Sequence, residues 1–176
     1  MNKMKTAQKA RFISKLGKAG RVLVIRLKTG SDLLPVLGQI IKEKGFKAGV
    51  ILSAVGLLSS GRLRNCMSLP ENFPITDRNR SFQQLKVPLE ILSMSGNISM
   101  AEGKPLVHSH VTLSYVEDGS IHVVGGHLIE GCIVHGFAEI IVMELIDIDM
   151  IKYYDEETKT LQIFSYPKRS GKSRIE

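Results

Sequence analysis

The alternation of apolar and polar residues divides most of the chain into β-strands. Residues 21–30 ("RVLVIRLKTG") form an apolar, β-branched run that ends at Gly30. Residues 48–61 ("AGVILSAVGLLSSG") form a second run, in which Gly56 is expected to cause a bend or bulge. Further strands and a terminal hairpin are expected over residues 85–100, 106–115, 120–128, 132–148 and 150–166. The short gaps between these runs favour antiparallel pairing, because a parallel crossover needs roughly a dozen residues or more.

One segment has the periodicity of a helix instead. Between Ser31 and Phe46 apolar residues recur at the spacing that buries one stripe of a helix, at positions 33, 34, 37, 40 and 41. Ser31 or Asp32 can cap its start, and Gly45 suits its end. One helix among many strands predicts an α+β fold, in which a mostly antiparallel sheet carries one main helix on a face.

Two stretches are expected to lie outside this sheet. Residues 7–20 ("AQKARFISKLGKAG") can form a short basic helix that is broken at Gly17 and Gly20. Residues 66–81 ("CMSLPENFPITDRNRS") are rich in turn formers and are expected to form a loop or an irregular edge.

Length and composition fit one globular domain. The chain has 176 residues, of which 43% are hydrophobic and 23% are charged, as in ordinary soluble proteins. No apolar run is long enough to span a bilayer or to act as a secretory signal. Cys66 and Cys132 lie in no CxxC pair, so we expect reduced, buried thiols in a cytoplasmic protein without a membrane partner.

The positive charge is concentrated at the two ends of the chain. The formal net charge is +7; residues 1–21 contribute +7 and residues 167–176 contribute +3. Residues 22–166 therefore carry −3, which argues against a basic DNA-binding face on the body. Basic ends can still add phosphate contacts, although solubilising ends explain the same pattern. We divide the chain into a basic extension (1–20), one domain (21–166) and a basic tail (167–176).

Three histidines are predicted to share one face of a β-hairpin. Side chains alternate between faces within "VHSHVTLSY", so His108 and His110 point the same way. Asp118-Gly119 is a preferred pair for a two-residue type I′ turn. Around that turn, His110 lies directly opposite His127, with Cβ atoms roughly 4.5–5.5 Å apart. His108 then lies on the diagonal, roughly 7–8 Å from His127.

Three imidazoles in such a triangle can bind one metal ion. Zinc is commonly held by three histidines with one open position, at metal–nitrogen distances of about 2.0–2.1 Å. Nickel, iron or manganese suit the same ligands. The same register places His122 on the other face, opposite Tyr115, so we expect His122 and also His135 to be ordinary surface or core histidines.

Other residues near this hairpin are candidates for a supporting role. Gly125 and Gly126 leave space for a small ligand, a solvent molecule or another backbone. A bend in the chain after Glu130 would bring its carboxylate toward the site, as a general base or as a partner of a metal ligand. Arg62 and Arg64 could contact an anion, although arginines on a solvated loop usually have no such role.

The motifs around these residues resemble the plants-and-prokaryotes-conserved (PPC) domain. "EILSMSGN", the H-x-H pair and "GGHLIEG" occur in the family's order, and the likeness covers roughly residues 21–165. The resemblance implies a strongly bent antiparallel sheet, assembled as a homotrimer, and a fold resembling acetolactate decarboxylase, a zinc enzyme with a three-histidine site. In prokaryotic members it also implies one metal ion per chain, usually zinc, on three histidines that match His108, His110 and His127.

Plant members of the family differ from this chain in two ways. They add an AT-hook and bind A·T-rich minor grooves, but the basic ends of this chain lack the R-G-R-P core of that motif. They also have Gly-Arg-Phe where this chain has Val87-Pro88-Leu89 before Glu90. The chain therefore resembles the prokaryotic, histidine-bearing type.

Three functions are compatible with these features. We expect a metal-binding, cytoplasmic homotrimer with a regulatory or DNA-binding role. As a DNA-binding protein, the chain would use its basic ends for phosphate contacts. The alternative is a metal-dependent enzyme, lyase- or hydrolase-like, that acts on a small carbonyl or carboxylate compound. Phosphate-binding loops of the Walker and dinucleotide types and the G-x-S-x-G elbow are absent, which argues against nucleotide-dependent enzymes and serine hydrolases of those classes.

Overall fold

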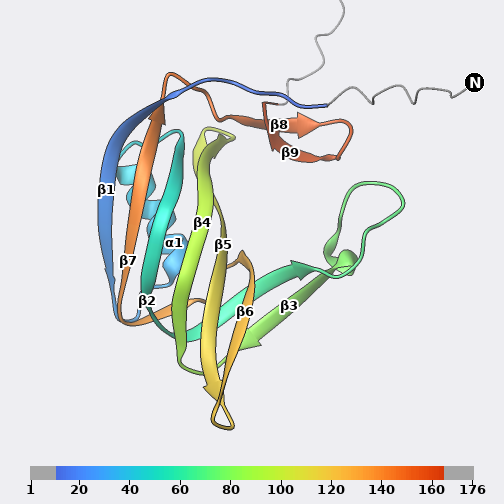
Figure 1. Ribbon diagram of the computed structural model, residues 1–176. Helices are drawn as coiled ribbons and strands as arrows, with labels where there is room; N and C mark the ends of the chain where they lie inside the picture. The colour runs from blue at the N-terminus through green and yellow to red at the C-terminus, as the bar shows by residue number, and fades with distance from the viewer. Residues whose placement is uncertain (1–10, 165–176) are drawn as a thin grey trace, which may run out of the picture.

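The longest strand, β2 (Gly49–Cys66), organises the sheet of the computed structural model, which describes residues 11–164 (Figure 1). The first part of β2 lies between two strands and its last part between two others. The remaining elements are β1 (Lys18–Lys28), α1 (Leu33–Glu43), a 3₁₀ turn (Asp77–Asn79), β3 (Arg80–Leu85), β4 (Leu89–Ala101), β5 (Lys104–Glu117), β6 (Ser120–Leu128), β7 (Ile133–Ile146), β8 (Lys152–Asp155) and β9 (Thr160–Ile163).

The sheet curls until β2 meets β6. The strand order is β1-β7-β2-β4-β5-β6, with β3 paired to β2 and an additional β2–β6 pairing; every pair of named strands is antiparallel. Register shifts along β2 bend the strand, one of them at Gly56, where φ is +152°. β8 and β9 form the separate hairpin that was predicted near the C-terminus. The α+β fold with a mostly antiparallel sheet is confirmed.

The helix α1 covers one face of this sheet (Figure 1). Its stripe of Leu33, Leu37 and Ile41 is fully buried against the sheet core. Burial of each such side chain contributes about 1.5–3 kcal/mol. Asp32 precedes the helix, but its carboxylate makes no capping bond; instead it accepts a hydrogen bond from the backbone N–H of Gly131 at 2.8 Å.

Two predictions about the periphery are wrong, the N-terminal helix and the burial of Cys66. Residues 11–17 form no helix, and β1 begins at Lys18 because Lys18 and Ala19 pair with β7; residues 7–10 lie outside the described part of the chain. The stretch 66–81 is irregular over residues 67–76 and continues into the 3₁₀ turn, as expected; only its two ends are strand, since Cys66 ends β2 and Arg80 begins β3. Cys132 is buried as expected, but Cys66 is exposed, because β2 extends beyond the core.

The helices of residues 11–164 include none with the length and apolar character that a membrane crossing requires.

Candidate metal centre

The hairpin of β5 and β6 has the register that the sequence predicts. Its turn residues Asp118 and Gly119 have φ values of +49° and +74°, the left-handed conformation that a type I′ turn requires. His110 pairs directly with His127, and no bulge interrupts the ladder. Tyr115 pairs with His122 on the opposite face, and their rings stack 5.2 Å apart.

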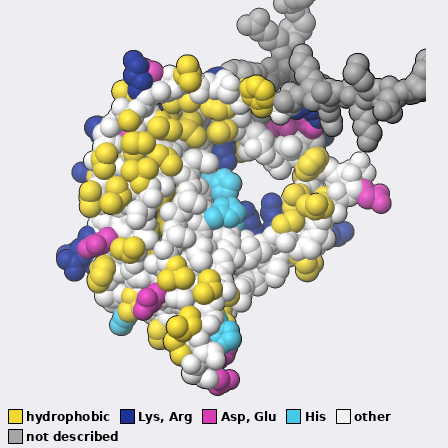
Figure 2. All heavy atoms as spheres, in the orientation of Figure 1, with side chains coloured by type: hydrophobic (Ala, Val, Ile, Leu, Met, Phe, Trp, Pro, Cys, Tyr) yellow, Lys and Arg dark blue, Asp and Glu magenta, His cyan; other side chains and the backbone are white. Residues whose placement is uncertain are grey.

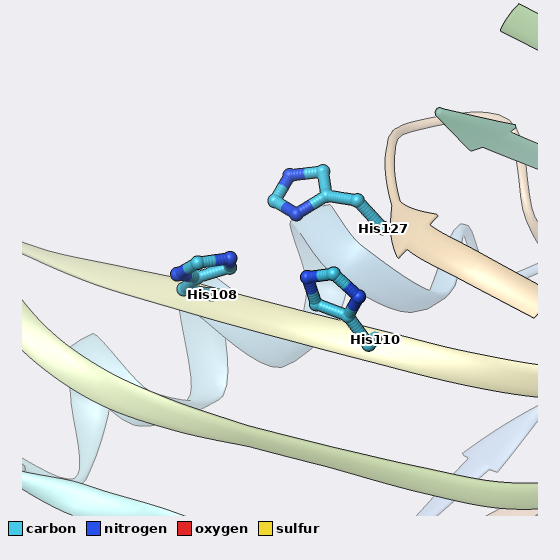
Figure 3. Close-up of side chains that lie close together, drawn as sticks. All are labelled: His108, His110 and His127. Carbon is cyan, nitrogen blue, oxygen red and sulfur yellow. The ribbon is translucent and has the colours of Figure 1, made fainter. Parts of the chain in front are cut away.

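The three histidines on the other face converge on a common space. His108 and His110 project from β5 and His127 from β6, with their rings turned toward one another (Figure 3). The ring centroids are 4.9–5.5 Å apart, and one nitrogen from each ring lies within 4.8 Å of the others. Nitrogens that share one tetrahedral ion are roughly 3.3–3.5 Å apart, so small side-chain rotations suffice to close the set.

The surroundings keep two of these imidazoles neutral. Burial, followed by the nearby charge of Arg64, lowers the pKa of His127 to about 4. Burial is also the main cause of the lowered pKa of His108, followed by the charge of Lys152. A neutral imidazole has a lone pair that can bind a metal without first releasing a proton. Both side chains are therefore ready to act as ligands at neutral pH.

An orphaned polar atom lies next to one ligand. Asn97 on β4 is the direct cross-strand partner of His108, and its side-chain oxygen is buried without a hydrogen-bond partner. Metal-bound histidines usually donate their second ring N–H to such an acceptor. Asn97 is thus placed to orient His108, which fits a metal-binding role for the histidine set.

The histidines line two adjoining hollows, of about 220 and 260 Å³, that share Arg64, His108 and His127. Lysine and arginine side chains lie around this opening, between the sheet and the arm formed by the end of β2 and β3 (Figure 2). The other lining residues are Asn65, Cys66, Ile75, Arg80 and His110 in one hollow, and Leu106, Val107 and Lys152 in the second. No acidic residue of the described chain is among them.

The pairing of β2 with β6 brings positively charged side chains next to the histidines. Arg64 is the direct partner of His127 across this pair, so the two side chains lie on the same face. Arg80 joins from β3, opposite Cys66, and Lys152 from β8. Sequence reasoning identified Arg64 but missed Arg80 and Lys152, because no local signal indicates which strand meets β6.

The remaining candidates lie around this centre. Arg62 and Glu130 are exposed, and neither lines the hollows. The Asn65 side chain crosses the space beside Gly126 and donates a hydrogen bond to the carbonyl of Gly125 at 2.9 Å. A side chain thus packs against this glycine pair, whereas ligand approach there stays a prediction, as do the roles of Arg62 and Glu130.

Comparison with known proteins identifies the family. The family model of the Plants and Prokaryotes Conserved (PCC) domain, abbreviated PPC above, matches residues 14–146. The chain belongs to the PCC domain family. A bifunctional GlmU protein of Synechococcus sp. (strain JA-3-3Ab) is 32% identical over 143 residues, which are 81% of this chain but 20% of that protein. This chain therefore spans about a fifth of the length of the curated relatives it matches.

Solved structures of PCC relatives share the fold. A metal-containing protein from Archaeoglobus fulgidus is 29% identical, with a TM-score of 0.69 over 88% of this chain and 100% of that chain. A plant- and prokaryote-conserved protein from Pyrococcus horikoshii is 27% identical, with a TM-score of 0.70 over 89% and 99%. A structure from Ralstonia eutropha JMP134, provisionally named a DNA-binding protein, is 23% identical, with a TM-score of 0.63 over 82% and 90%.

Proposed function

We propose that this PCC-domain protein binds one divalent metal ion per chain, zinc in the first instance, through His108, His110 and His127. The observation that carries the proposal is the hairpin register, which leaves one nitrogen of each ring within 4.8 Å of the others. The A. fulgidus relative, which is a metal-containing protein, supports the same role. The protein is a soluble, cytoplasmic metal-binding module in this proposal.

The chain's own residues set the properties of this site. Three imidazoles supply nitrogen donors, and the buried side-chain oxygen of Asn97, which has no hydrogen-bond partner, is placed to accept the second ring N–H of His108. A bound zinc ion supplies Lewis acidity at its open position. The hollows leave room for a small molecule there, which keeps a metal-dependent enzyme as the alternative, although no carboxylate of the described residues lines them as a general base.

Metal analysis of matched variants tests the proposal. We expect one equivalent of zinc in the dialysed protein and an affinity weakened by about 100-fold or more in His110→Ala, because a direct ligand is lost. His122→Ala is the matched control, since His122 lies on the other face of the same hairpin. An unchanged metal content in His110→Ala, or an equal loss in His122→Ala, would contradict the proposal.

We also propose that the chain assembles as a homotrimer. On the sheet face away from α1, large apolar side chains are exposed, among them Val24 at 71% and Ile121 at 75%. Exposed apolar surface of this extent is typical of an interface. Light scattering should give three times the 19.5 kDa chain mass, and Ile121→Asp should shift it to the monomer. Leu161→Asp, on the separate β8–β9 hairpin, is the control; a monomeric wild type contradicts the proposal.

A DNA-binding role is the second candidate. It is favoured by the basic ends, since residues outside 11–164 contain seven lysines and arginines but only one acidic residue, Glu176. The expected test is duplex binding at two salt concentrations, with and without residues 1–10 and 167–176. Loss of salt-sensitive binding on truncation supports this role, and equal binding by both forms contradicts it.

A further inference from the structure

The hollow beside the histidines collects positive charge without a matching carboxylate. Arg64 and Lys152 both line the hollow of about 260 Å³, and neither has an ion-pair partner among residues 11–164. Arg80 is different, because it lines the adjoining hollow and forms an ion pair with Asp77 at 2.9 Å. All three potential metal ligands are neutral donors. A divalent ion bound there would therefore add two further positive charges that no lining side chain offsets.

The two unpaired cations reach the hollow from different strands. Arg64 lies across the β2–β6 pair from His127, whereas Lys152 belongs to β8 and lies beside His108 and Leu106. Burial lowers the pKa of both side chains, and the charge of Arg80 adds to the effect on Arg64. Partly buried cations without a counter-ion are energetically unfavourable, and a bound anion would relieve that cost.

We propose that the hollow binds a small oxyanion, a carboxylate or a phosphate, held by Arg64 and Lys152 beside the three histidines. A planar guanidinium can grip two oxygens of such a group, while the ammonium acts as a point charge. The hollow that both cations line, of about 260 Å³, has room for roughly nine waters at about 30 Å³ each, which fits a compound of similar heavy-atom count. This inference rests on the proposed metal site, because the anion would lie beside the bound metal ion. It adds the chemical class of the small molecule that the site would take.

Calorimetric titration of the full-length, zinc-loaded protein tests this inference. The probes are succinate and inorganic phosphate, which separate the two kinds of oxyanion, and neutral succinamide, which controls for shape. The variants are Arg64→Gln and Lys152→Gln. Arg26→Gln is the matched control, because it removes one guanidinium from β1 at the far edge of the same sheet. Zinc content is measured in every sample.

The expected result is that at least one anion binds and succinamide does not. Each of Arg64→Gln and Lys152→Gln should weaken anion binding by roughly tenfold or more, as expected for loss of one charge-assisted hydrogen bond. Arg26→Gln should bind as the wild type does. Binding of neither anion, or equal weakening in Arg26→Gln, overturns the inference.

The two proposals fail in distinguishable ways. If the wild type holds no zinc, the metal proposal fails, and the same titrations on the metal-free protein still test the anion site. Dependence of binding on Arg64 and Lys152 then supports the oxyanion site on its own. If zinc is bound at one equivalent and neither variant changes anion binding, the metal proposal stands and the oxyanion inference is wrong.

Discussion

The two sides of the candidate metal centre are assembled by different kinds of chain contact. The histidine side lies on one hairpin, where a two-residue turn sets His110 opposite His127. The cationic side comes from β2, β3 and β8, which lie outside the hairpin and on both sides of it along the chain. Donor geometry therefore depends on a local turn, whereas the charge around it depends on closure of the whole sheet. The two sides should respond separately to mutation.

The largest effect on stability and zinc binding is expected at the contact between β4 and β5, the strand that carries His108 and His110. A Cβ at Gly96 would overlap the backbone carbonyl oxygen of His108 and crowd Ser109. Because these contacts are mostly with backbone atoms, β4 or β5 would have to shift to relieve them. We expect Gly96→Ala to lower the free energy of unfolding by about 3 kcal/mol, measured by urea denaturation, and to weaken zinc binding.

Gly38→Ala provides the control for this substitution. Gly38 lies in α1, and a Cβ there meets nothing within 4 Å, so alanine should stabilise the protein by up to about 1 kcal/mol. A stability of Gly96→Ala within about 0.5 kcal/mol of the wild type would show that the β4–β5 contact does not constrain His108.

The turn of the hairpin should have the next largest effect. Gly119 has a φ of +74°, and valine there would carry a β-branched side chain in the left-handed region. We expect Gly119→Val to cost about 1–2 kcal/mol in unfolding free energy and to weaken zinc binding, because the register loosens. Ser120→Val, on the adjacent strand residue, should be tolerated. Equal zinc affinity in Gly119→Val and the wild type would contradict a turn-defined site.

The contact between Asn65 on β2 and Gly126 on β6 joins the two sides, and its loss should have a smaller effect on the free energy of unfolding. A Cβ at Gly126 would lie 2.6–2.9 Å from the amide of Asn65, which would have to leave its bond to the Gly125 carbonyl. Gly126→Ala and Asn65→Ala should each cost about 1 kcal/mol. In the double variant the costs should fall short of their sum by about 0.5 kcal/mol or more, because both remove the same contact. Additive costs would mean that Asn65 does not link β2 to β6.

The smallest expected effect is a change in the pKa of His127 when the charge of Arg64 is removed. In the metal-free protein, NMR titration should give a pKa of about 4 for His127. Arg64→Gln should raise this pKa, but not to its ordinary value, because burial is the larger cause. A folded pKa below the unfolded one means that this histidine's contribution to stability is present above about pH 6.5 and is lost as the pH falls toward 4. An unchanged pKa in Arg64→Gln would contradict this electrostatic link between Arg64 and His127.

The features that could be predicted from the sequence are those with a local cause. The helix from Leu33 to Glu43 follows from its apolar spacing, and the histidine register follows from Asp118-Gly119. β3 was missed because "RSFQQL" lacks the alternation of a half-buried strand. Residues 11–17 were expected to be helical because their apolar residues have helical spacing, but pairing of β1 with β7 decides the conformation from Lys18 onward.

The features that could not be predicted depend on long-range pairing. Arg80 and Lys152 reach the two hollows beside the histidines only after β2 has paired with β3 and β6 and after the β8–β9 hairpin has packed beside β4. The exposure of Cys66 has the same origin, because it depends on how far β2 runs past the core. Local periodicity carries no information on these contacts.

Zinc K-edge X-ray absorption of the zinc-loaded protein in solution tests the central claim most directly. The account predicts three imidazoles at metal–nitrogen distances of about 2.0–2.1 Å, with oxygen completing the coordination. A sulfur ligand at about 2.3 Å would assign the metal to Cys66, which lines the same hollow. That result, or fewer than three imidazoles, would contradict the account.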